Sequence, residues 1–184
     1  MNKKHIVILI TVVVALLMMA TCSYAKGPWK GRVIDAETKQ PIEGAAVVAV
    51  WKKVLNFLPP GPMDMYLDAE ETVTDTKGEF VIPSKWFISI PFFRKVTGPR
   101  FTIFKPGYGS FPEHQVFPKY TPIELFEGKG VVVELPKLNL KTREERLKYL
   151  PGTPYGMDGH ENKMSQFKRL LDEEIRSINS SDIK

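Results

Sequence analysis

Short β-prone segments follow one another along this chain with turn residues between them and no helical segment separating them. This arrangement constrains the fold more than any other feature of the sequence. It favours a mainly β fold, an antiparallel sandwich of about seven strands with Greek-key connections. The predicted strands are 29–34, 45–51, 71–74, 79–82, 100–105 and 131–135, with a seventh between Tyr108 and Phe117.

Turn chemistry marks the connections between these strands. Segment 35–44 is polar and is expected to close a hairpin between the first two strands. Segment 75–78 has aspartate first and glycine fourth, which suits a type I turn closing a second hairpin. Pro106 and Gly107 fit the centre of a type II turn, because glycine takes positive φ at low cost. Tyr108 follows, and we expect its ring to lie on the core and its hydroxyl to bond a backbone group.

Segment 45–51 is apolar at every position. Because neither of its faces is polar, this strand is expected to lie centrally and to be covered on both sides. Alternation along a strand would place Ala45, Val47, Ala49 and Trp51 on one face and Ala46, Val48 and Val50 on the other.

Motifs at Gly31 to Val47, Glu71 to Pro83 and Lys105 to Tyr108 carry a resemblance to a known family. With them, residues 29–138 resemble the carboxypeptidase regulatory-like, transthyretin (prealbumin)-type β-sandwich. The resemblance implies a seven-stranded Greek-key domain, which we place at residues 26–138. It also implies a non-catalytic accessory or binding role on secreted proteins, and it names no ligand.

The first 25 residues have the pattern of a secretory signal peptide. Lys3 and Lys4 precede an apolar run over 6–20, and small residues at Ser23 and Ala25 predict cleavage after Ala25. The run spans about 22 Å as a helix, less than the roughly 30 Å hydrocarbon core that an uncleaved anchor must cross. We therefore expect export to the periplasm or cell envelope.

Cys22 offers an alternative to simple cleavage. It is the only cysteine, and the residues before it loosely resemble a bacterial lipoprotein signal, which would make Cys22 a lipidation site and the protein a membrane lipoprotein. After cleavage at Ala25 the chain has no cysteine, so its stability must come from a hydrophobic core. The formal net charge of +5 includes Lys3 and Lys4, and the other charges are mixed in sign, which does not favour nucleic-acid binding.

Residues 139–184 differ in composition and form the predicted C-terminal helical tail. Segment 141–149 is charged and helix-prone, and 161–178 has one apolar stripe at helical spacing. An amphipathic helix of this kind needs a partner surface, either the sandwich of its own chain or another protein. The stripe consists of Met164, Phe167, Leu171, Ile175 and Ile178, with Leu170 beside it.

Two predicted connections, 52–67 and 84–98, are longer and more apolar than a hairpin needs. If strands alternate in direction, both loops lie at one end of the sandwich and both tight turns at the other. Exposed apolar loops there would form an interaction site for a protein partner, a membrane surface or a glycan. The alternative is that they cap the open core. The candidate binding residues are Phe57, Met65, Tyr66, Trp86, Phe92, Phe93, Arg94, Phe167 and Leu171.

No catalytic or cofactor site is expected. The same fold includes hydroxyisourate hydrolases, but their early histidine and terminal Tyr-Arg-Gly-Ser pattern have no counterpart in a chain with only His114 and His160 after the leader. Segment 158–161 is interpreted as a turn and Asp68, Glu70 and Glu71 as a solvated strand edge, so no metal site is predicted. The predicted function is a non-enzymatic exported binding or assembly module that contacts a protein partner through 52–67, 84–98 and the C-terminal helix.

Overall fold

The computed structural model describes residues 2–19, 22–56, 61, 63–89, 94–114, 126, 130–140, 142–154, 156–157 and 159–180. Within these ranges the chain is mainly β with a C-terminal helix, as the sequence predicts, and another helix lies near the N-terminus. The elements are α1 (Lys3–Met19), β1 (Cys22–Lys26), β2 (Trp29–Asp35), β3 (Ala46–Leu55), β4 (Met63–Val73), β5 (Glu79–Ile82), β6 (Lys85–Ser89), β7 (Arg94–Phe104), β8 (Val131–Leu135), α2 (Arg143–Lys148), the 3-10 turn η2 (Glu161–Lys163) and α3 (Ser165–Ser180).

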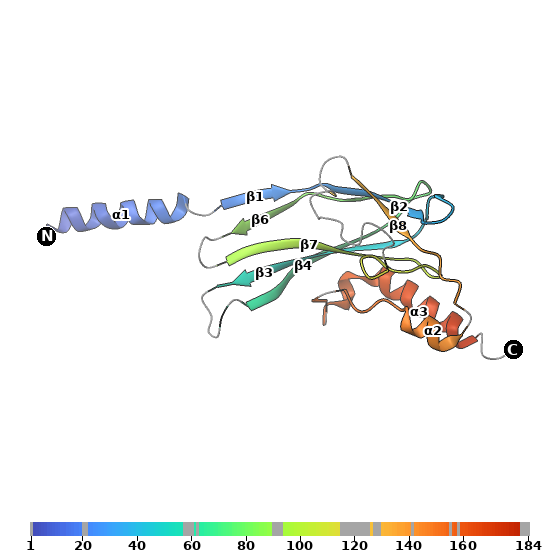
Figure 1. Ribbon diagram of the computed structural model, residues 1–184. Coiled ribbons are helices and arrows are strands. Elements are labelled where there is room, and N and C mark those ends of the chain that lie inside the picture. The colour runs from blue at the N-terminus through green and yellow to red at the C-terminus, as the bar shows by residue number, and fades with distance from the viewer. Residues whose placement is uncertain are drawn as a thin grey trace.

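The strands form two layers. One layer holds the ladders β1–β6 and β5–β2–β8, and the other holds β4–β3–β7 (Figure 1). Helix α3 packs on the second layer, while α1 projects away from the sandwich. The apolar core between the layers includes the side chains of Trp29, Val33, Trp51, Phe101 and Phe126.

The expected hairpins between 29–34 and 45–51 and between 71–74 and 79–82 are wrong, because the strands of each pair belong to different layers. The expectation of purely antiparallel pairing is also wrong, since β2 pairs parallel with β8. The cause lies in β3, which is apolar on both faces and is buried fully only as the middle strand of the second layer. The segments before and after it therefore cross between layers.

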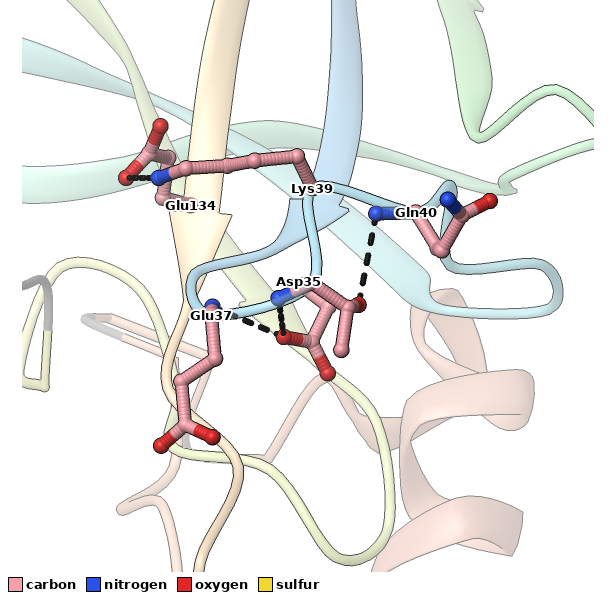
Figure 2. A network of polar contacts seen from close by, with 6 residues as sticks. Asp35, Glu37, Lys39, Gln40 and Glu134 are labelled. Carbon is pink, nitrogen blue, oxygen red and sulfur yellow. Dashed lines mark hydrogen bonds and ion pairs between the residues drawn. The ribbon is translucent and has the colours of Figure 1, made fainter.

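A carboxylate organises the crossing from β2 to β3. Asp35 accepts hydrogen bonds from the backbone N–H groups of Glu37 (2.8 Å) and Thr38 (2.9 Å), and Lys39 pairs with Glu134 at 2.8 Å (Figure 2). These backbone hydrogen bonds, that of Thr38 above all, hold the pKa of Asp35 below its ordinary value. The arrangement turns the chain sharply where the layer ends.

Both short turns have the predicted geometry. The N–H of Gly78 donates to the carbonyl of Asp75 at 2.8 Å, and the N–H of Tyr108 donates to the carbonyl of Lys105 at 3.1 Å. Gly78 and Gly107 have φ of +73° and +80°. The ring of Tyr108 packs on the core as predicted, but its hydroxyl donates to the Asp35 carboxylate at 3.2 Å and not to a backbone group.

The prediction for segment 45–51 is confirmed, since every residue in it is buried. Its odd-numbered side chains lie in the core between the two layers, and its even-numbered side chains lie in a second cluster beneath α3. Strand β3 also pairs with β4 on one side and with β7 on the other. It is therefore the central strand of the fold.

The predicted loops 52–67 and 84–98 are largely strand. Strand β3 continues to Leu55, which pairs with Met63 on β4 and with Arg94 on β7. Apolar residues with prolines among them obscured the alternation that marks a strand. Only the short connections around 57–62 and 90–93 separate these strands, and most of their residues lie outside the described ranges.

Strands β1–β2 and β5–β6 form one long antiparallel ribbon with a single register. Lys26 pairs with Lys85, and Trp29 pairs with Ile82 at the same offset. By that offset, Pro28 and Pro83 stand opposite each other in the gap between the ladders. No ladder pair is formed over 27–28 or 83–84, so the ribbon is interrupted between its two ladders.

The C-terminal helix docks on its own sandwich, which is one of the two alternatives for the tail. Two glutamates hold it there. Glu71 on β4 accepts from the N–H groups of Gln166 (2.9 Å) and Phe167 (2.6 Å), which satisfies donors in the first turn of α3. Glu174 accepts from the N–H of Gly107 at 3.1 Å and from Arg146 at 3.0 Å. The predicted helix within 141–149 is also present, as α2 with a capping box at Thr142.

Candidate binding surface

The connection from β3 to β4 and the connection from β6 to β7 lie at one end of the sandwich, which we call the loop end. Leu55, Met63 and Arg94 are register partners there, and Ser89 precedes the short connection to Arg94. The predicted loops 52–67 and 84–98 are wrong in extent, but the residues that flank the remaining short connections lie at a common end, as predicted for the loops. Helix α1 also leaves the molecule from this end (Figure 1).

Four large apolar side chains near the loop end face solvent. Trp86 is 75 % exposed, Ile88 53 %, Met63 44 % and Met65 39 %. Trp86 and Ile88 share the outer face of β6, whereas Phe87 between them points into the core. An exposed tryptophan side chain is unfavourable in water and is frequent at protein interfaces. The outer face of β6 is therefore the main candidate contact site on this surface.

The other predicted site residues have different positions. Tyr66 is half-buried and stacks on His160 at 3.9 Å between ring centres, and Arg94 is half-buried at the start of β7. Phe167 is buried beneath α3, and Leu171 packs on the same cluster. The helical face that was a candidate contact surface is thus already occupied by the chain's own sheet. Phe57, Phe92 and Phe93 lie outside the described residues.

A lysine that the sequence reasoning did not single out fixes β6 against β4. The ammonium group of Lys85 forms ion pairs with Asp68 and with Glu70 (2.6 Å) and lies 4.9 Å from the centre of the Trp51 ring. Burial opposes ionisation of this lysine, but the hydrogen bonds to the two carboxylates outweigh burial and raise the pKa of Lys85. The acids predicted as a solvated edge are therefore half-buried partners of a cation.

The same cluster makes stability depend on pH. Burial opposes ionisation of Asp68, but the hydrogen bond from Lys85 outweighs it, and the pKa of Asp68 is lowered. A lowered pKa in the folded state gives stability that is present above the unfolded value of about 3.9 and is lost as pH falls through the folded value. Because Asp68 is partly exposed, we expect Asp68→Asn to cost only about 1 kcal/mol at pH 7.

Urea unfolding of the wild type and of Asp68→Asn between pH 7 and pH 2 measures this effect. The difference in free energy of unfolding should shrink below about pH 4. The control is Asp172→Asn, which changes an exposed aspartate away from the Lys85 cluster and should cost little at pH 7. A cost for Asp68→Asn that stayed constant down to pH 2 would contradict the role of the Lys85 pair.

A serine and a histidine also meet, in the loop after β7. The hydroxyl of Ser110 lies 3.0 Å from Nδ1 of His114 and 3.0 Å from the carboxylate of Glu113. The backbone N–H of Ser110 donates to the same Nδ1, and Ser110 is buried. A nucleophile needs a free base and access to substrate, so this contact acts to hold the loop together.

No metal cluster is found among the described residues, where no three His, Cys, Asp or Glu side chains gather closely enough to hold an ion. His160 stacks on Tyr66, and Asp158 beside it lies outside the described ranges. Across those ranges, no helix combines the length and apolarity that crossing a membrane requires. Helix α1 itself has 17 residues.

Near the loop end the exposed side chains are those of Trp86 and Ile88 on β6 and of Met63 and Met65 on β4, with the half-buried Arg94 beside them. The ion pairs of Lys85 hold β6 against β4. Such a surface suits recognition by shape and apolar contact. In comparisons with known proteins, no family model, no curated protein and no solved structure matches this chain.

Proposed function

We propose that this chain is an exported, non-enzymatic binding or assembly module of the cell envelope, periplasmic after removal of its leader, and that its loop end contacts a protein partner. We further propose that its fold is the seven-stranded Greek-key, transthyretin-like sandwich of the carboxypeptidase regulatory-like family. The observation that carries the functional proposal is the exposure of Trp86 and Ile88 on one face of β6.

Several features favour a protein partner over a glycan or a membrane surface. Trp86 lies beside aliphatic Ile88, and Met63 and Met65 are exposed on β4 at the same end. Aromatic residues, methionine and arginine are enriched at protein interfaces. A glycan platform usually needs planar rings to stack on, and within the described residues Trp86 is the one exposed tryptophan.

A membrane lipoprotein is the second candidate, and β1 favours it. Cleavage before Cys22 would keep the whole strand that pairs with β6, whereas cleavage after Ala25 would keep only Lys26 of it. In that case Cys22 would carry the lipid and the loop end would lie close to the membrane. The mass of the processed chain distinguishes the two candidates.

The test is mild crosslinking in the native envelope, followed by purification and intact-mass measurement. A chain that begins at Lys26 and crosslinks to one recurrent protein supports the proposal. Trp86→Glu should reduce that crosslink at least tenfold, as expected for an interface anchor. Val132→Glu is the matched control, because Val132 is also exposed but lies on β8, away from the loop end.

Other outcomes point elsewhere. A chain that begins at an acylated Cys22 supports the lipoprotein. A third outcome is a chain that begins at Lys26, crosslinks to no protein and binds a glycan, with the binding abolished by Trp86→Glu. That outcome would indicate a carbohydrate-binding module. A chain retained unprocessed in the cytoplasm would contradict export under either candidate.

A further inference from the structure

Strand β6 has one partner in the structure. It pairs with β1 from Lys85 opposite Lys26 to Ser89 opposite Cys22. On its other side it forms no ladder with any strand in the described part of the chain, although β7 follows it in sequence. The one ladder that β6 forms among the described residues is therefore the ladder with β1.

The predicted cleavage point lies inside that partner strand. Removal of the leader after Ala25 takes away every residue of β1 except Lys26. The backbone N–H and C=O groups of β6 that faced β1 then lose their partners, and unpaired strand edges pair readily with other extended segments.

We expect strand β6 to keep its place when β1 is lost, because its side chains are anchored elsewhere in the fold. The side chain of Phe87 is anchored in the core, where it contacts the Trp51 ring at 5.7 Å between centres. Lys85 is held by Asp68 and Glu70 on β4, in the opposite layer. These contacts are made with β3 and β4, which leader removal does not touch, so we expect the exposed edge to remain a preformed strand.

We propose that leader removal opens β6 as a strand acceptor, and that an extended segment of a partner protein pairs antiparallel with it in the position that β1 occupies. This inference rests on the proposed function, because it requires export and cleavage after Ala25. Strand addition of this kind draws affinity from main-chain hydrogen bonds and specificity from alternate side chains.

The register indicates the chemistry of the incoming strand. In β1 the small residues Ser23 and Ala25 stand opposite Ile88 and Trp86. A small residue opposite Trp86, as Ala25 is in the structure, leaves space for the exposed indole to lie across the added strand. The strand that occupies this edge in the structure is uncharged over 22–25 and has small residues at alternate positions. We therefore infer that the occupant is a segment of a partner protein with the same pattern.

Fluorescence of the processed protein can test the acceptor directly. The probe is a synthetic peptide of residues 21–27 with serine in place of Cys22. Trp29 and Trp51 are fully buried, so changes in acrylamide quenching report on Trp86. We expect saturable binding that protects Trp86 from the quencher. Alternate residues of an added strand direct their N–H groups toward β6, and the residues between them direct theirs away from it. Methylation of the nitrogens that face β6 should therefore abolish binding, whereas methylation of the others should not.

Side-chain variants provide the matched pair. Ile88→Lys should weaken peptide binding at least tenfold, whereas Val132→Lys should not change it, since both residues are 53 % exposed but only Ile88 lies on β6. A processed chain that begins at Lys26 and does not bind the peptide would overturn the inference and leave the proposed function standing if its protein crosslink persists.

Two further results would also overturn the strand acceptor. A mature chain that begins at or before Cys22 keeps β1 on the edge, so β6 would be closed to partners. A dimer in solution that Ile88→Lys dissociates would show that a second copy occupies the edge. Failure of the proposed function has a separate signature, which is absence of export and processing.

Discussion

Replacing Phe167 with alanine is expected to lower the free energy of unfolding by about 4 kcal/mol, the range seen when a large buried aromatic side chain is deleted. Phe167 is almost fully buried between α3 and β3 and meets Phe104 at 5.8 Å between ring centres. Its backbone N–H is also bonded to Glu71, so the helix cannot easily shift to fill the cavity. Urea denaturation followed by circular dichroism measures the loss.

The neighbouring Lys168→Ala is the control, because Lys168 is exposed on the same helix and should change stability by less than about 0.5 kcal/mol. The urea unfolding curve also shows whether α3 unfolds together with the sandwich. If it does, Phe167→Ala shifts a single unfolding transition to a lower urea concentration. An early separate loss of helix, with the sandwich transition unchanged, would show that the tail is not part of the cooperative unit.

Gly78→Ala is expected to cost about 3 kcal/mol, through backbone strain and a steric clash together. Gly78 has φ of +73°, where a side chain is disfavoured, and a Cβ there would collide with the carbonyl oxygen of Val33. The Gly78 carbonyl also accepts the N–H of Val33 at 2.8 Å, so the turn cannot retreat from β2 without breaking a hydrogen bond. Thermal and urea unfolding would measure the change.

Gly107→Ala separates the two contributions. Gly107 has a similar φ of +80°, but an added Cβ would meet no atom within 4 Å. Only the conformational cost of about 1 kcal/mol remains there. Equal losses for the two variants would mean that the close approach of Gly78 to β2 contributes nothing to the stability of the turn.

Local signals in the sequence predicted the elements that depend on local physics. The unbroken apolar run over 45–51, combined with the two-residue period of a strand, predicted the two buried faces of β3, and the Asp75 and Gly107 turns followed from backbone preferences. Both properties are set within a few residues. Assignment of strands to layers is a long-range outcome, which is why the hairpins expected around β3 were wrong.

The site was predicted only in part for a similar reason. The common position of the two long connections follows from strand direction, and the exposure of Trp86 agrees with its choice as a candidate. The burial of Phe167 and Leu171 could not be read from a helical stripe, because the stripe looks the same whether its partner is its own sheet or another protein. The Lys85 cluster joins residues of β4 and β6 that no sequence spacing relates.

The gap in which Pro28 and Pro83 stand opposite each other divides the long ribbon into two units of local opening. No ladder pair is formed over 27–28 or 83–84, so the β2–β5 ladder and the β1–β6 ladder are separate hydrogen-bonded units. Separation of β1 from β6 therefore has little energetic coupling to the rest of the sheet. The precursor can lose its first strand in a sub-global fluctuation, while the core around Trp29 keeps its native structure.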